Sequence, residues 1–220
     1  MCFSASVSFT TGALLVPLGA YQLIKANGEN KRLILFAAFP LLFGIQQLFE
    51  GLLWLGLDGV LPQYITVSAL GFLLFAFLIW PVIVPYAAWL PETNKLRKNT
   101  ILILMVTGAI LGGLLYLPLL FDSGRLSPAI MQNSISYRSA LLLDELVPRE
   151  VNCGVYTVLV TVPLFISSFS AIRIYGLLIM LSVLISALFF HYAFTSVWCF
   201  FAAILSLYTI RLLRIVPDRQ

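Results

Sequence analysis

Blocks of mostly apolar residues, each about 20 residues long, recur along the whole chain and constrain its fold more than any other feature. A bilayer core about 30 Å thick requires about 20 predominantly apolar residues per helix. The sequence therefore predicts an all-α, polytopic membrane protein, a seven-transmembrane-helix bundle that forms a single membrane domain over residues 1–220. The predicted helices cover roughly residues 5–24, 33–57, 64–89, 99–121, 151–172, 174–191 and 194–213.

The composition excludes a water-soluble domain. Of the residues, 61% are hydrophobic and 10% are charged, whereas soluble domains carry roughly a quarter charged residues. The net charge is +4. Because basic residues in membrane proteins collect at the cytoplasmic ends of helices, this charge does not indicate a nucleic-acid partner. The expected partner is the lipid bilayer.

Most of the predicted helices are joined by short polar turns, but residues 122–150 form a longer connection that holds seven charges. Within it, Asn133 to Arg138 alternates like a short strand, and Ala140 to Leu146 has a helical pattern. Long connections in compact bundles are more often functional than idle. We therefore expect an extracytoplasmic loop or lid here. The last two helices, separated by Tyr192 and Ala193, should form a tight hairpin.

The distribution of Lys and Arg predicts the orientation, because cytoplasmic loops retain positive charge. With the N-terminus outside, the outer side receives three basic residues, Arg125, Arg138 and Arg149. The N-terminus is therefore expected outside and the C-terminus in the cytoplasm. The opening residues lack the charged region and cleavage site of a signal peptide, so the first apolar block should be a retained helix. The ten cytoplasmic basic residues are Lys25, Lys31, Arg32, Lys95, Arg97, Lys98, Arg173, Arg211, Arg214 and Arg219.

Glu50 is the one acidic or basic side chain placed well inside a predicted span. Ionisable groups at such depth are costly and are functional candidates by default. Gln46 and Trp54 lie one turn to either side of Glu50 and Gln47 lies three residues before it, so the four side chains share a helical stripe. This pattern predicts a polar site, and the alternative is a structural carboxylate that joins the second helix to its neighbours.

The predicted topology brings the cysteines and the single histidine toward the outer leaflet, at Cys2, Cys153, His191 and Cys199. Three chemistries use such residues. One disulfide can form in an oxidising compartment, with Cys2 and Cys199 as its natural pair if the first and last helices are neighbours. A metal or haem site would use His191, thiolates and Glu50, although one histidine excludes sites with several histidine ligands. Nucleophilic catalysis with His191 as base has no signature in the spacing.

Three motifs resemble an uncharacterised family of bacterial multi-helix integral membrane proteins. They are the opening Met-Cys-Phe-Ser-Ala-Ser, the run Leu-Leu-Phe-Gly-Ile-Gln-Gln-Leu-Phe-Glu-Gly with Trp54 after it, and Phe-Thr-Ser-Val-Trp-Cys-Phe-Phe-Ala-Ala from Phe194. The similarity runs the full length, but the family has no assigned activity. We expect a multi-pass protein of the bacterial inner (cytoplasmic) membrane. The motif positions here are Cys2, Ser4, Gln46, Gln47, Glu50, Gly51, Trp54, Ser196, Trp198 and Cys199.

The motif positions include Cys2 and Cys199 but not Cys153 or His191, so the resemblance favours Cys2 and Cys199 as a disulfide or cooperating thiol pair over a metal site. We expect an outward-facing polar pocket centred on Glu50 that binds or transports a small polar or cationic ligand. A membrane-embedded enzyme or redox/metal protein that uses Cys2, Cys199, Glu50 and His191 is one alternative. A structural membrane subunit is another. No cofactor is assigned. The candidate ligand-binding residues are Glu50, Gln46, Gln47, Trp54, Trp198 and Ser196.

Overall fold

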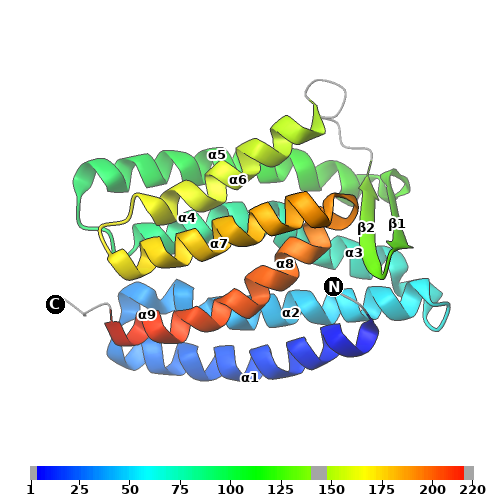
Figure 1. Ribbon diagram of the computed structural model, residues 1–220, viewed down its shortest axis with the longest axis horizontal. Helices are drawn as coiled ribbons and strands as arrows, with labels where there is room; N and C mark the ends of the chain where they lie inside the picture. Colours follow the sequence, from blue (N-terminus) through cyan, green and yellow to red (C-terminus); the bar gives the residue numbers. More distant parts are fainter. Residues whose placement is uncertain (1–3, 140–147, 216–220) are drawn as a thin grey trace.

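The protein is an elongated bundle of helices with a small β-hairpin at one end (Figure 1). The computed structural model describes residues 4–139 and 148–215. The helices are α1 (Ala5–Glu29), α2 (Ile34–Leu57), α3 (Ile65–Leu73), α4 (Trp80–Trp89), α5 (Lys95–Phe121), α6 (Arg149–Phe165), α7 (Ser170–Phe189), α8 (Phe194–Leu205) and α9 (Thr209–Ile215), and the strands are β1 (Leu126–Met131) and β2 (Ser134–Ser139).

Helices of membrane-spanning length dominate the described residues, which confirms the coarse form of the predicted fold. Six helical rods are long and apolar enough to cross a membrane by length and composition. Short segments of 3-10 or π-helix join neighbouring elements into several of these rods. The rods are Ala5–Glu29, Lys31–Leu57, Pro62–Trp89, Lys95–Phe121, Ser170–Phe189 and His191–Ile215.

The predicted boundary between the fifth and sixth helices is wrong. We expected helices over 151–172 and 174–191, but α6 ends at Phe165 and α7 begins at Ser170. Two serines form the turn, and Ser168 donates hydrogen bonds from its backbone N–H (2.8 Å) and its hydroxyl (2.6 Å) to the carboxylate of Glu92. Apolar residues flank the two serines, so the hydropathy pattern gave no sign that the helix ends there. The turn is stabilised by Glu92, which is distant in the sequence.

Residues 126–139 form an antiparallel hairpin, which departs from the all-α prediction. The strand expected over Asn133 to Arg138 is present as β2, and β1 pairs with it from Leu126 opposite Ser139 to Met131 opposite Ser134. Gln132 and Asn133 between the strands both have positive φ, 46° and 56°, as in the two-residue turns that match strand twist. The helix expected over Ala140 to Leu146 lies outside the described residues.

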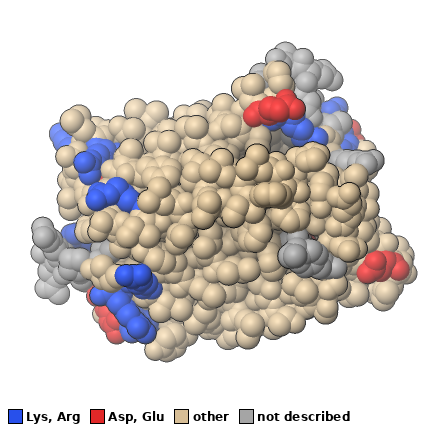
Figure 2. Space-filling model, in the orientation of Figure 1, with Lys and Arg blue, Asp and Glu red and all other residues tan. Residues whose placement is uncertain are grey.

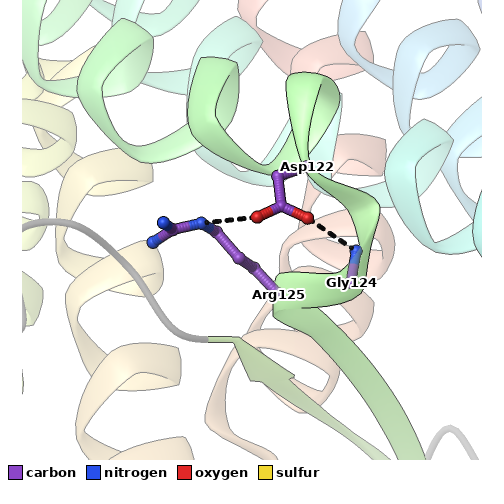
Figure 3. A network of polar contacts seen from close by, with 3 residues as sticks. All are labelled: Asp122, Gly124 and Arg125. Atoms are coloured by element: carbon purple, nitrogen blue, oxygen red, sulfur yellow. Dashed lines mark hydrogen bonds and ion pairs between the residues drawn. The ribbon is translucent and has the colours of Figure 1, made fainter.

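The hairpin is joined to α5 by a polar turn and packs against α3 and α8. Asp122 accepts hydrogen bonds from the Gly124 N–H (3.2 Å) and from Nε of Arg125 (3.1 Å), which closes the turn after α5 (Figure 3). The pair is largely exposed, so it defines the turn geometry more than it adds stability. Where the hairpin packs against α3, the ring of Tyr137 in β2 stacks on the ring of Phe72 in α3, with centroids 4.7 Å apart.

Helix α2 lies at the centre of the bundle and packs against α1, α3, α4, α8 and α9. Its contact with α1 is very close. A Cβ atom on Gly19 of α1 would lie 2.2 Å from the backbone nitrogen of Leu41 in α2. Small residues at helix contacts allow such approach in membrane proteins, where dispersion and interhelical hydrogen bonds replace the hydrophobic effect.

The third rod, Pro62–Trp89, is irregular at its middle, where Leu74–Ile79 is a π-helix between α3 and α4. Pro81 follows it and has no N–H to donate to the carbonyl of Phe77, four residues earlier. Helix α5 passes against this segment. A Cβ on Gly112 would lie 2.6 Å from the carbonyl oxygen of Phe77, and one on Gly108 would lie 2.2 Å from that of Pro81. Glycine at both positions therefore lets α5 approach the irregular backbone.

We predict that Gly108→Ala lowers the unfolding temperature in detergent, because the added methyl group would overlap the Pro81 carbonyl. Overpacking of this kind costs about 1–3 kcal/mol. Gly113→Ala in the same helix is the matched control, since the nearest atom to its Cβ position is 3.9 Å away. Alanine there should be neutral or stabilising by up to about 1 kcal/mol. Equal unfolding temperatures for the two variants, measured by circular dichroism, would contradict the close contact.

Candidate functional site

Glu50 is fully buried in α2, at 0% exposure. It lies seven residues before Leu57, the end of α2 nearest the hairpin, and a rise of 1.5 Å per residue places it about 10 Å from that end. One carboxylate oxygen accepts a 2.6 Å hydrogen bond from the Ser196 hydroxyl of α8. The other accepts a 3.2 Å bond from the Gln47 amide. Uncharged donors from two helices therefore hold a carboxylate in the interior.

Gln46 belongs to the same polar region but joins α2 to the irregular third rod. Its amide nitrogen donates to the carbonyl of Phe72 (3.4 Å), and its amide oxygen accepts from the indole N–H of Trp80 (2.8 Å). The carbonyl of Ala76 in the π-helix accepts a hydrogen bond from Tyr156 of α6. Side-chain donors thus reach two carbonyls of this rod, one two residues before the π-helix and one within it. Such donors stabilise irregular membrane helices.

Three buried polar atoms at the level of Glu50 have no hydrogen-bond partner within the described residues, namely Oε1 of Gln47, Nε1 of Trp54 and Oγ of Ser8. Gln47 and Trp54 neighbour Glu50 on α2. Ser8 lies at the same level on α1, because the ring of the adjacent Phe9 lies 3.0 Å from the Cβ position of Gly51. An unsatisfied buried polar group costs about 1–3 kcal/mol. The region therefore has hydrogen-bonding capacity that the described residues do not use.

Sequence patterns predicted the grouping of Glu50 with Gln47, whereas Ser8 was missed. A serine eight residues from the start, in an apolar block, carries no signal of its own. Only the close packing of α1 on α2 brings it to the level of Glu50. Ser196 was expected from the family motif, and the structure brings it into hydrogen-bonding contact with Glu50 across 146 residues of sequence.

A cavity of about 30 Å³ lies between α2, α4, α6, α7 and α8, large enough for about one water molecule. Trp198 and Cys199 line it, whereas Glu50, Gln46, Gln47 and Trp54 do not. The cavity borders the polar region through Trp80, which also donates to Gln46. The indole N–H of Trp198 is buried and has no hydrogen-bond partner among residues 4–139 and 148–215. The residues that line the cavity are Phe39, Phe43, Trp80, Val84, Tyr156, Val160, Leu164, Tyr175, Ile179, Trp198, Cys199 and Ala202.

The predicted disulfide between Cys2 and Cys199 is not supported. Cys199 is a buried free thiol, eight residues beyond the start of the last rod at His191 and therefore about 12 Å from that end. Cys2 lies outside the described residues. Cys153 is also a free thiol, and His191 is exposed at the helix end. Within residues 4–139 and 148–215, no group of three His, Cys, Asp or Glu side chains is arranged to hold a metal ion.

A second buried carboxylate, Glu92, was not predicted. It lies between α4 and α5, is 2% exposed, and accepts hydrogen bonds from the N–H groups of Thr93 (3.0 Å), Asn94 (2.9 Å) and Ser168, and from the Ser168 hydroxyl. Burial acts to raise the pKa of Glu92, but these hydrogen bonds outweigh it and lower the pKa below its usual 4.5. Asn94 caps α5 by accepting a hydrogen bond from the Arg97 N–H, and an asparagine before a helix is a local sequence signal that could have indicated this turn. Glu92 joins the α4–α5 turn to the α6–α7 turn.

We predict that Glu92→Gln destabilises the protein at pH 7 by about 1–3 kcal/mol, because hydrogen bonds to a charged acceptor are lost. A lowered pKa means that the ionised carboxylate stabilises the fold above pH 4.5, and that this stability is lost as the pH falls below that value. The wild type should therefore lose stability over this range more steeply than the variant. The measurement is the unfolding temperature against pH.

The control is Glu29→Gln, an exposed carboxylate at the end of α1, 3.7 Å from Lys25. Surface pairs of this kind contribute about 0–1 kcal/mol, so this variant should keep the wild-type pH dependence. A Glu92→Gln protein whose stability falls with acid as steeply as the wild type would contradict the role given to Glu92.

No curated protein and no solved structure matches the chain. A model described as "Family of unknown function (DUF6629)" matches residues 1–219, which agrees with the resemblance to an uncharacterised family. Because this match covers nearly all of the 220 residues, the chain belongs to that family.

Proposed function

We propose that this protein is a seven-span membrane protein, with its N-terminus outside and its C-terminus in the cytoplasm, that binds a small cationic ligand beside Glu50 and carries it across the membrane. The observation that carries this proposal is the fully buried Glu50 carboxylate, held by Ser196 and Gln47 at the level of polar atoms that have no partner in the part of the chain that the structure describes. Orientation, span count and binding chemistry each have their own support.

The charge distribution supports the orientation. In Figure 2 most Lys and Arg side chains lie at one end of the molecule, opposite the hairpin in the view of Figure 1, and a smaller basic group lies on the hairpin side. We call these ends the basic end and the hairpin end. Basic residues concentrate on the cytoplasmic side of membrane proteins, so the basic end is assigned to the cytoplasm. The described basic residues there are Lys25, Lys31, Arg32, Lys95, Arg97, Lys98, Arg173, Arg211 and Arg214, against Arg125, Arg138 and Arg149 near the hairpin.

The contacts of α6 support a seventh crossing. At its start, Arg149 donates a 3.4 Å hydrogen bond to Ser139 of the hairpin. Beyond its end, Ser168 bonds to Glu92 at the basic end. The 17 residues of α6 extend about 25 Å at 1.5 Å per residue, slightly less than the hydrocarbon thickness. With seven crossings, the start of α1 and the end of α9 lie on opposite sides of the membrane, and so do the two termini.

The ligand chemistry follows from the atoms that surround Glu50. Carboxylate, amide and hydroxyl oxygens are hard ligands that suit hard cations. Glu50 supplies the negative charge, while the unpartnered Gln47 Oε1 and the Ser8 hydroxyl offer further oxygen atoms. A single carboxylate balances one positive charge. Intramembrane carboxylates commonly mark ion pathways, so a transported monovalent cation is favoured over a merely structural role for Glu50.

We predict that Glu50→Gln weakens cation binding at least tenfold. Removing a charged partner costs about 1.5–3 kcal/mol, and 1.4 kcal/mol is a factor of ten in affinity. Titration of the purified protein with sodium, potassium and methylammonium chloride, followed by tryptophan fluorescence, measures this, because Trp54 and Trp80 lie in or next to the polar region. Choline chloride at equal ionic strength corrects for salt effects.

The matched control is Glu150→Gln, an exposed carboxylate near the hairpin end of α6, which should titrate like the wild type. Ser196→Ala tests the same site without changing its charge and should weaken binding less than Glu50→Gln. If Glu50→Gln binds each cation as the wild type does, or if the wild type responds to none of them, the carboxylate is structural.

A further inference from the structure

Two arginines from different helices meet at one short turn of the basic end, and we call them the arginine pair. Arg97 lies in the first turn of α5, and its Nη1 donates a 3.1 Å hydrogen bond to the Ser168 hydroxyl, 71 residues away in sequence. Arg173 lies in the first turn of α7, and its Nη1 donates to the carbonyls of Ser167 (2.9 Å) and Ser168 (3.3 Å). The turn between α6 and α7 therefore holds both guanidinium groups in place.

Both guanidinium groups keep donors for a ligand. An arginine side chain carries five N–H donors, and the hydrogen bonds of the pair within residues 4–139 and 148–215 use Nη1 alone. Arg97 and Arg173 are both exposed, so their remaining donors are accessible from outside the bundle. The planar fork of an arginine binds two oxygen atoms of one phosphate group. The chemistry of the arginine pair therefore suits a phosphate.

The protein does not balance the positive charge around this turn. Lys95, Arg97 and Lys98 begin α5 and Arg173 begins α7, while neither helix has an acidic residue in its first turn. Glu92 supplies one negative charge, but its carboxylate already accepts four hydrogen bonds. Neither of the two ion pairs in the described structure includes any of these residues. Four positive charges against one negative charge leave a net charge of three for an external anion to neutralise.

An exposed apolar stripe on α7 begins next to the arginine pair. Its four leucines follow Arg173 at spacings of four and three residues, which keep them on the same side of the helix as the arginine. The stripe continues for 15 residues beyond Arg173, or about 22 Å at 1.5 Å per residue, which exceeds half of a hydrocarbon core about 30 Å thick. The residues of this leucine stripe are Leu177, Leu181, Leu184 and Leu188.

An aromatic side chain marks the same level of the molecule as a membrane interface. The ammonium group of Lys98 lies 4.1 Å from the centroid of the Trp89 ring, and Trp89 packs on Tyr86 with centroids 5.9 Å apart. Tryptophan and tyrosine are enriched where the polar headgroups meet the hydrocarbon. A ligand bound here would thus have a charged group at the headgroup level and apolar chains beside α7.

We propose that the arginine pair binds the phosphate of an anionic phospholipid, with an acyl chain along the leucine stripe of α7. Basic residues beside membrane helices attract anionic headgroups, and the uncompensated charge favours a headgroup with net negative charge over a zwitterionic one. The phosphate accepts hydrogen bonds from both arginines and so joins α5 to the α6–α7 turn, the same junction that Glu92 holds from inside. This inference does not depend on cation binding at Glu50.

The test is a titration of the full chain in neutral detergent with phosphatidylglycerol and with phosphatidylcholine, with bound lipids counted by native mass spectrometry. The wild type should bind its first phosphatidylglycerol at least about tenfold more tightly than phosphatidylcholine. Arg97→Gln combined with Arg173→Gln should abolish this preference. The matched control is Arg211→Gln combined with Arg214→Gln, which removes the same charge from exposed positions on α9 at the basic end and should keep the wild-type preference.

Three results would overturn the proposal. A wild type without preference for phosphatidylglycerol excludes the site, and an equal loss in both double variants means that the whole basic end attracts anionic lipids without the arginine pair. Displacement of phosphatidylglycerol by excess inorganic phosphate means that the site takes free phosphate instead of a lipid. Arg97→Lys combined with Arg173→Lys separates lost charge from a folding defect. This variant should restore the preference, and its failure to do so at a wild-type unfolding temperature contradicts binding through charge.

Discussion

Burial of a carboxylate at the centre of an apolar bundle is the constraint on which the packing around α2 depends. Glu50 is fully buried, and its oxygen atoms accept hydrogen bonds from Gln47 on the same helix and Ser196 on α8. In hydrocarbon, a polar group without such donors is costly, so α8 must stay in register with α2. Gln46 likewise joins α2 to the third rod, because it hydrogen-bonds to the indole of Trp80 and to the carbonyl of Phe72.

The other buried carboxylate shows a different solution to the same problem. Glu92 is held by backbone N–H groups and one serine at the turns of the basic end, whereas Glu50 is held by side chains inside the bundle. Backbone donors at a turn are fixed by local geometry. Burial acts to raise the pKa of Glu92, but the Ser168 hydroxyl and these backbone donors together lower it. We interpret Glu92 as a structural residue that holds the α4–α5 turn and the α6–α7 turn together. Glu50 is instead held by side chains and lies at the level of buried polar atoms that have no partner among the described residues, which supports the binding role that we propose for it.

Much of the architecture was predictable from local patterns, and the misses share one cause. Apolar block length predicted the helical rods, and alternation predicted β2, but the turn at Ser167 and Ser168 was placed several residues too late. Its stability comes from Glu92, which is 76 residues away in sequence. Similarly, stripe spacing on one helix grouped Gln46, Gln47 and Glu50, while their partners Trp80 and Phe72 belong to another rod and carried no signal in the spacing of α2.

The sequence by itself determined that the chain forms long apolar helices, that its basic residues separate toward one end, and that one carboxylate lies within a span. These are properties of single segments, set by composition and helical period. Only the tertiary structure decided which side chains meet: Ser196 with Glu50, Thr209 with Gln22, and Cys199 with a small aromatic cavity. Such meetings depend on how closely helices approach, and glycine contacts such as that of Gly19 with Leu41 fix this distance in a way that no single segment encodes.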